Sequence, residues 1–145
     1  MNAQFRHVET NQDLHAAFEV MRELRPHLAD ADGFIAQVAR QAREGYRLLA
    51  AWEGTELVGL AGYRHQENLI YGRFLYIDDL VTTASVRSTG VGAALIQAVR
   101  EEGYRHGCKQ LILDTGLGNS LAQRFYFRQG LLSRALHFGQ ALSKA

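Results

Sequence analysis

The spacing of apolar and polar residues predicts two helices near the start of the chain. Apolar residues recur every three or four positions from residue 11 to about residue 25, and again from about residue 32 to residue 44. A period of 3.6 residues is typical of amphipathic helices. Thr10, with Asp13 three positions later, is a typical helix N-cap, and Pro26 and Gly45 mark the two helix ends.

A period of two residues predicts a sheet in the middle of the chain. Residues 46–66 form two strand-like runs around the tetrapeptide Glu-Gly-Thr-Glu at 53–56, which is typical of a hairpin. The aromatic and β-branched run GRFLYIDDLVT, residues 72–82, predicts a third strand. Phe5–Val8 predicts a further, short edge strand.

The last third of the chain predicts alternating helices and strands. A helical pattern begins near Val91, a short buried strand is expected at 109–115, and a helix follows from Asn119 or Ser120 to Gly130. Residues 131–142 alternate between apolar and polar positions and predict a final strand. The order β-α-α-β-β-β-α-β-α-β predicts a single α/β domain over residues 1–145, a mixed sheet flanked by helices.

Composition excludes several classes of function. Sixteen basic and fifteen acidic residues give a net charge of +1 without a basic stripe, so nucleic acid is not an expected partner. The apolar runs are too short to span a membrane, and the polar N-terminus is unlike a secretory signal. Cys108 is the single cysteine, and the six histidines show no ligand spacing. We therefore expect a cytoplasmic protein without a metal.

The segment VRSTGVGAAL, residues 86–95, is the first candidate for chemistry. It places Arg87, Gly90 and Gly92 at the start of a predicted helix. A P-loop requires a Gly-Lys-Ser/Thr sequence, and a dinucleotide fingerprint requires a third glycine where Leu95 stands. Two interpretations remain, an Arg-x-x-Gly-x-Gly turn whose N–H groups hold a phosphate and an ordinary glycine-rich loop.

A second motif in register supports the phosphate-binding interpretation. The segment NSLAQRFYFRQG matches Asn-x-x-Ala-x-x-Phe-Tyr-x-x-x-Gly through Asn119, Ala122, Phe125, Tyr126 and Gly130, one strand after the glycine turn. With both motifs, the chain resembles the GCN5-related N-acetyltransferase (GNAT) superfamily over nearly its whole length. The resemblance implies a mostly antiparallel, twisted sheet and an acetyl-CoA-dependent N-acetyltransferase.

The resemblance also implies roles for particular residues. The backbone of the glycine turn would hold the coenzyme A pyrophosphate, and the end of the third long strand would pair with the pantetheine arm. The N–H of Leu80 would polarise the acetyl carbonyl, Asn119 would reach the pantetheine, and Tyr126 would stand beside the thioester sulfur. The cofactor-binding residues implied in this way are Leu80, Val81, Thr82, Arg87, Ser88, Thr89, Gly90, Val91, Gly92, Ala93, Asn119 and Tyr126.

Two adjacent aspartates in a strand are the candidate groups for the acceptor amine. Asp78 and Asp79 lie in GRFLYIDDLVT, where aspartate is disfavoured. Because side chains alternate along a strand, one carboxylate is expected to face the cleft and the other the opposite side, unless a bulge exchanges them. The polyamine-acetylating branch has an acidic residue at the place of Asp78, so we favour Asp78 as the base. In the alternative interpretation, both aspartates bind loop amides or an arginine such as Arg73.

The expected reaction is direct attack of a primary amine on acetyl-CoA in a ternary complex. The acceptor would be a small molecule or an exposed amino group of a protein. Tyr126 would protonate the leaving thiolate, unless it is an ordinary core aromatic. The alternative function is a non-catalytic acyl-CoA-binding sensor. Apolar residues such as Leu131, Leu136 and Phe138 in the predicted final strand suggest a homodimer.

Overall fold

The structure, a computed structural model, describes residues 2–143 of the 145-residue chain. The described residues divide into two compact units, residues 2–113 and residues 114–143. Each unit is described by itself below. Within the described part of the chain, no helix has the length and apolar character that a membrane span requires.

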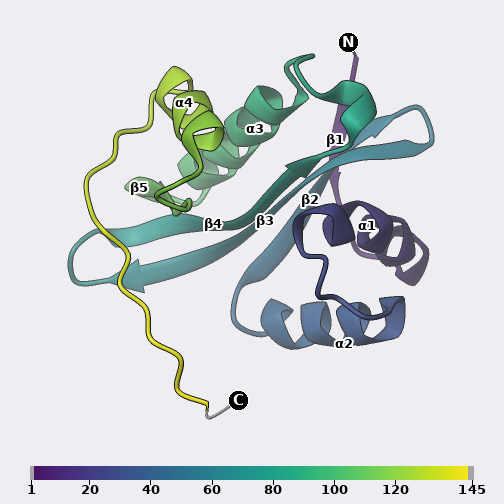
Figure 1. Ribbon diagram of the computed structural model, residues 1–145, viewed down its shortest axis with the longest axis horizontal. Helices are drawn as coiled ribbons and strands as arrows, with labels where there is room; N and C mark the ends of the chain where they lie inside the picture. Colours follow the sequence, from purple (N-terminus) through teal and green to yellow (C-terminus); the bar gives the residue numbers. More distant parts are fainter. Residues whose placement is uncertain (1, 144–145) are drawn as a thin grey trace. The chain divides into compact units, whose positions relative to one another are not determined.

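The first unit is built on a five-stranded sheet in the order β1-β2-β3-β4-β5. Neighbouring strands from β1 to β4 are antiparallel, whereas β4 and β5 are parallel. Figure 1 shows the long β3–β4 hairpin at the centre of this unit. The strands are β1 (Gln4–His7), β2 (Tyr46–Glu53), β3 (Glu56–Asn68), β4 (Gly72–Thr82) and β5 (Gln110–Leu113). The predicted mixed, mostly antiparallel α/β architecture is confirmed.

Helices cover both faces of this sheet (Figure 1). Helices α1 (Asn11–Leu24) and α2 (Ala31–Ala42) pack on one face, and their core includes Phe18, Phe34 and Tyr46. Helix α3 (Val91–Arg105) packs on the other face through residues such as Leu95 and Val99. The parallel pairing of β4 with β5 follows from α3, because a helical crossover returns the chain to the same end of the sheet.

Local sequence signals account for the ends of the first two helices. The Thr10 hydroxyl accepts a hydrogen bond from the Asp13 backbone N–H at 3.1 Å, as predicted for an N-cap. Asp30 caps α2 in the same way, with 2.7 Å between its carboxylate and the Gly33 N–H. Helix α1 ends at Leu24, before Arg25 and Pro26, because a residue that precedes proline is disfavoured in a helix.

Strand β5 is half-buried along its length, so the prediction of a buried strand at 109–115 is wrong in that respect. The reason is that β5 lies at the edge of the sheet and, within the described residues, pairs with β4 on one side only. Residues 110–113 still pack against the α3 side of the core through Leu111 and Leu113.

The second unit contains helix α4 (Ser120–Arg128) and an irregular C-terminal segment. The prediction of a final strand at 131–142 is wrong: residues 131–143 form no strand in the structure. Alternating apolar residues are insufficient for a strand, because its N–H and C=O groups also need a neighbouring strand. Leu132, Leu136 and Phe138 are instead exposed, at 74%, 66% and 89%. The homodimer rested on this strand and stays a prediction.

Candidate active site

The turn between β4 and α3 has two residues in the left-handed region. Ser88 has φ 65° and Gly90 has φ 93°. The Thr89 hydroxyl donates a hydrogen bond to the Val86 carbonyl and closes the turn that follows the short helix η1 (Ala84–Val86). A Cβ added at Gly90 would meet no atom within 4 Å, so glycine is favoured there by its backbone conformation and not by lack of space.

The first turn of α3 differs from that of the other α-helices in the described residues. Gly90 is its N-cap residue and supplies no side-chain acceptor, whereas α1, α2 and α4 are capped by Thr10, Asp30 and Asn119. The first N–H groups of a helix have no acceptor within the helix, and the helix dipole makes this end partly positive. The turn can therefore bind an anion through its backbone.

Arg87, Ser88 and Thr89 are exposed in this turn, while Val91 is buried and Ala93 is half-buried. Arg87 lies 3.9 Å from the carboxylate of Glu23 on α1. Both side chains of this pair are largely exposed, so the pair adds little stability. Gly92 is the second residue of α3.

The C-terminal part of β4 extends past its pairing with β5. The last pair of the parallel ladder is Ile77 with Leu113, whereas β4 continues to Thr82. Leu80 and Thr82 are half-buried, and Val81 is buried at 8% exposure. An extended ligand can add to such an edge through main-chain hydrogen bonds. The implied roles of Leu80, Val81 and Thr82 toward pantetheine stay predictions.

A β-bulge lies where β4 leaves β5. Gly62 of β3 pairs with Asp79, but Tyr63 pairs with Ile77, so Asp78 is the extra residue. The bulge resets the alternation and turns both aspartates toward the face covered by α1 and α2. Asp78 binds Arg64, which pairs across the sheet with Tyr46, and Asp79 binds Tyr46 itself. The expectation that the carboxylates face opposite sides is therefore wrong.

Each carboxylate has its own arginine. Asp78 accepts two hydrogen bonds of 2.8 Å from Arg64, a bidentate pair that raises the pKa of the Arg64 guanidinium further. Asp79 accepts a hydrogen bond of 3.0 Å from Nε of Arg25, and Arg25 also donates to the Asp78 carbonyl oxygen at 2.8 Å. The suggestion of Arg73 as a partner is not what the structure shows, because Arg64 and Arg25 take that place.

Tyr46 completes the surroundings of Asp79. Its hydroxyl donates to Oδ2 of Asp79 at 2.8 Å, and its side chain is 3% exposed. Burial, and then the negative charge of Asp79, raise the pKa of the Tyr46 phenol well above its ordinary value. The phenol therefore stays protonated and acts as a hydrogen-bond donor at neutral pH.

Asp79 lies in the wall of a cavity of about 220 Å³ between α1, α2 and the sheet. Asp78 is not among the lining residues. The lining combines a polar end with apolar walls: Met21, Arg25, His27, Leu28, Phe34, Gln37, Val38, Gln41, Tyr46 and Asp79. The polar end offers the Asp79 carboxylate as an acceptor for an amine, beside the Arg25 guanidinium that pairs with it at 2.9 Å, and the apolar walls can hold a compact body attached to that amine.

Sequence reasoning missed Arg25, Tyr46 and Arg64. One signal was available: if the consecutive strands predicted at 56–66 and 72–82 are joined by a short turn, residue 64 pairs with residue 76, and Arg64 comes near Asp78. No comparable pattern links Arg25 or Tyr46 to Asp79, since they are 54 and 33 positions away.

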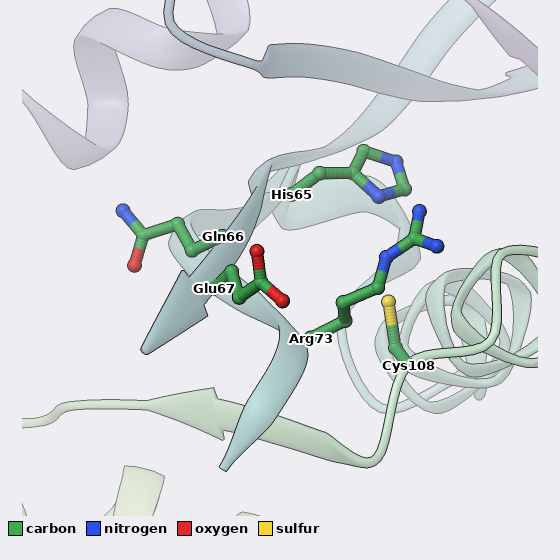
Figure 2. Close-up of a pocket in the computed structure, with 5 residues that line it drawn as sticks. All are labelled: His65, Gln66, Glu67, Arg73 and Cys108. Carbon is green, nitrogen blue, oxygen red and sulfur yellow. The ribbon is translucent and has the colours of Figure 1, made fainter. Parts of the chain in front are cut away.

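A second hollow, of about 210 Å³, lies toward the other end of the β3–β4 hairpin. Figure 2 shows the Arg73 guanidinium pointing toward the His65 ring, with the Cys108 sulfur beside Arg73. Burial raises the pKa of the Cys108 thiol, which agrees with the interpretation of Cys108 as a packing residue and not a nucleophile. Arg73 and Asp79 are six positions apart along β4, about 20 Å, so this hollow is distinct from the bulge.

In the second unit, the predicted residues Asn119 and Tyr126 lie on or beside α4. The Asn119 side-chain oxygen accepts from the Ala122 N–H at 3.2 Å, which confirms Asn119 as the cap. Tyr126 is half-buried, with its ring 5.5 Å from the Phe125 ring between centroids. Burial raises the pKa of the Tyr126 phenol, so it carries its proton at neutral pH.

The described residues contain no group of three or more His, Cys, Asp or Glu side chains arranged to hold a metal ion. The carboxylates at the bulge accept hydrogen bonds from arginines and a phenol.

Comparison with known proteins decides the family. The model of the acetyltransferase (GNAT) family matches residues 9–131, a region that includes parts of both units. The chain belongs to the GNAT family of acetyltransferases. An uncharacterised N-acetyltransferase of Bacillus subtilis (strain 168), YhdJ, is 33% identical over 111 residues, which cover 76% of this chain and 78% of YhdJ.

Solved structures of acetyltransferases share the fold. An acetyltransferase of Trypanosoma brucei superposes with a TM-score of 0.81 at 23% identity and covers 97% of this chain and 100% of its own. The aminoglycoside N-acetyltransferase AAC(6')-Iy, solved with a coenzyme A bisubstrate analogue, gives a TM-score of 0.84 at 18% identity, with 97% and 99% coverage. The resemblance inferred from the two motifs is thus confirmed, together with the enzyme class.

Proposed function

We propose that this protein transfers the acetyl group of acetyl-CoA to a primary amine by direct attack in a ternary complex. One observation carries the proposal. A single strand–turn–helix segment, residues 72–105, combines a carboxylate that lines a cavity with a helix N-terminus whose N-cap residue, Gly90, supplies no side-chain acceptor. The first feature suits an amine, and the second suits a pyrophosphate.

The residues of the turn fit the coenzyme that the family uses. Backbone N–H groups of residues 87–93 would bind the pyrophosphate, because Gly90, the N-cap residue of α3, supplies no side-chain acceptor of its own. The edge of β4 from Leu80 to Thr82, beyond its pairing with β5, would pair with the pantetheine arm, and Asn119 would contact the same arm. When bound, acetyl-CoA supplies the activated acetyl group.

Asp79 is the carboxylate that we assign to the acceptor amine. Its side chain lines the cavity, whereas Asp78 is held by two hydrogen bonds from Arg64. The Asp79 oxygens accept from Arg25 and Tyr46, and each retains acceptor capacity. Asp79 can therefore bind an ammonium group and draw off the proton that must leave before attack.

Tyr126 is the proposed donor to the leaving thiolate. A phenol with a raised pKa is protonated at neutral pH and can donate as the sulfur departs. A non-catalytic acyl-CoA sensor needs neither this donor nor a carboxylate in an acceptor-sized cavity. Both features favour the enzyme over the sensor.

The experiment is to measure release of free thiol from acetyl-CoA with a pool of tyramine, glucosamine, putrescine and lysine. Deconvolution of the pool and mass spectrometry then identify the acetylated amine. Amine-dependent thiol release supports the proposal. Tight binding of acetyl-CoA without release in the presence of any amine would instead favour the sensor.

A further inference from the structure

The hydroxyl of Tyr46 occupies a space that exists because residue 62 is glycine. A Cβ built at Gly62 would lie 2.0 Å from the Tyr46 hydroxyl oxygen, 2.7 Å from the ring carbon that bears it, and 2.8 Å from Oδ2 of Asp79. Real Cβ contacts are essentially never this short. Any other residue at position 62 would displace the tyrosine hydroxyl, the aspartate or both.

This arrangement lies at the bulge of the sheet. Gly62 is the residue of β3 that pairs with Asp79, and the register shift follows immediately between Gly62 and Tyr63. Tyr46 begins β2 and reaches the same point from the neighbouring strand. Three strands thus meet where Asp79 turns toward the cavity.

Tyr46 does more here than fill the core. A buried phenylalanine would supply the same ring but no donor to Asp79, and a Cβ at position 62 would clash both with the hydroxyl and with the ring carbon that bears it. Its hydrogen bond to Oδ2, together with the Arg25 bond to Oδ1, fixes both oxygens of Asp79. A carboxylate held at both oxygens keeps a fixed orientation, and Asp79 is held in this way in the lining of the cavity.

The groups that face Asp79 come from every element around it. Arg25 lies just past α1, His27 lines the cavity from the α1–α2 connection, and α2 contributes the uncharged amides of Gln37 and Gln41. Tyr46 approaches from β2, while Asp78 of β4 is itself neutralised by Arg64 of β3. Tyr46 is the neutral donor in this set that contacts the carboxylate directly.

We propose that Tyr46 is a positioning residue for acetyl transfer, which holds Asp79 toward the acceptor amine, and that Gly62 is required to admit its hydroxyl. This inference rests on the proposed function, because it assigns Tyr46 a role through Asp79. It predicts that loss of the Tyr46 hydroxyl changes kcat/KM for the amine and the pH dependence of the reaction. The Kd for acetyl-CoA should stay unchanged.

The test compares two buried tyrosines that each lose one hydroxyl. Tyr46→Phe should lower kcat/KM for the amine about tenfold, the effect of one hydrogen bond to a charged group. After the amine's own titration is divided out, the acid limb should move to higher pH, because a carboxylate that loses a donor keeps its proton more readily. Tyr63→Phe is the matched control: Tyr63 is 1% exposed, bonds His7 at 2.8 Å and packs on the α3 side of the sheet.

Two further variants keep the inference testable if Tyr46→Phe folds poorly. Gly62→Ala should reduce kcat/KM for the amine at least as much as Tyr46→Phe, with an unchanged Kd for acetyl-CoA. Replacement of Tyr46 by 3-fluorotyrosine keeps the shape and makes the phenol a stronger donor, so the acid limb should move to lower pH. A structural role alone would not produce opposite shifts in these two variants.

The outcomes separate the inference from the function on which it rests. Thiol release by the wild type, with opposite shifts for phenylalanine and 3-fluorotyrosine, supports both. Thiol release by the wild type, with Tyr46→Phe and Tyr63→Phe behaving alike, overturns the role of Tyr46 and leaves the function standing. Absence of amine-dependent thiol release in the wild type overturns both.

Discussion

The two halves of strand β4 have different surroundings. From Gly72 to Ile77 the strand is paired on one side with β3 and, from Phe74, on the other with β5, and it includes the fully buried Leu75. From Asp78 to Thr82 it is bulged, charged and without a β5 partner. The first half has the features of a structural element, and the second half has those of a site. A strand can serve both purposes when a bulge separates them.

Loss of the proton donor to the leaving thiolate should lower activity more than any other single change. If Asp79 serves the amine, thiolate departure needs a separate acid, which we assign to Tyr126. Tyr126→Phe should lower kcat by roughly 10²–10⁴-fold while the Kd for acetyl-CoA barely changes. Tyr104→Phe is the control, because Tyr104 is 75% exposed on α3. Full activity of Tyr126→Phe would make Tyr126 an ordinary packing residue.

Substitutions in the first half of β4 should lower the stability of the protein and leave the chemical step unchanged. Leu75 is 1% exposed in the α3-side core, so Leu75→Ala should lower the free energy of unfolding by about 2–5 kcal/mol. Leu80→Ala, at a half-buried position in the second half, should cost less. Chemical denaturation measures both. Equal losses at the two positions would contradict the division of the strand.

The turn after the second half should respond in coenzyme binding. Gly90 and Gly107 both have positive φ, at opposite ends of α3, and both have open space for a Cβ. Alanine at either position should therefore strain the backbone similarly, by about 1–2 kcal/mol. Gly90→Ala should also weaken acetyl-CoA binding by about tenfold in titration calorimetry, whereas Gly107→Ala should not. Equal affinities of the two variants would remove the pyrophosphate assignment.

A smaller effect, on the pH dependence of stability, is expected from His65 of β3, which pairs with Leu75 in the first half of β4. Burial, and then the neighbouring His106, lower the pKa of His65. The unfolded chain then binds the proton more readily, so stability is present above pH of about 6.5 and is lost as pH falls below it. In denaturation series from pH 7 to 5, His65→Gln should reduce the loss of stability with falling pH. The same substitution at exposed His15 should not reduce it. An unchanged pH dependence of stability in His65→Gln would contradict this role of His65.

Local patterns were sufficient for most of the fold. The caps at Thr10 and Asn119, the hairpin at residues 53–56 and the strand at 72–82 each depend on adjacent residues, and the structure confirms them. The strand predicted at 131–142 failed because alternation specifies which side chains share a face and does not provide a partner strand.

The candidate site was predictable to the extent that it lies in one segment. The glycine turn and the aspartate pair are each formed by neighbouring residues, so both could be recognised in the sequence. The orientation of the aspartates was not, because it depends on a bulge against Gly62. The contacts of Asp79 with Arg25 and Tyr46 depend on α1 and β2, which the fold brings to β4.

The pH dependence of kcat/KM for Asp78→Asn and Asp79→Asn, with one identified amine, shows most directly which aspartate serves the acceptor. If Asp79 serves the acceptor, Asp79→Asn should be impaired at neutral pH and recover toward high pH, where the free amine has already lost its proton. Asp78→Asn should keep the wild-type profile, because Asp78 binds Arg64 outside the cavity lining. A shifted profile for Asp78→Asn, with a wild-type profile for Asp79→Asn, would contradict the account.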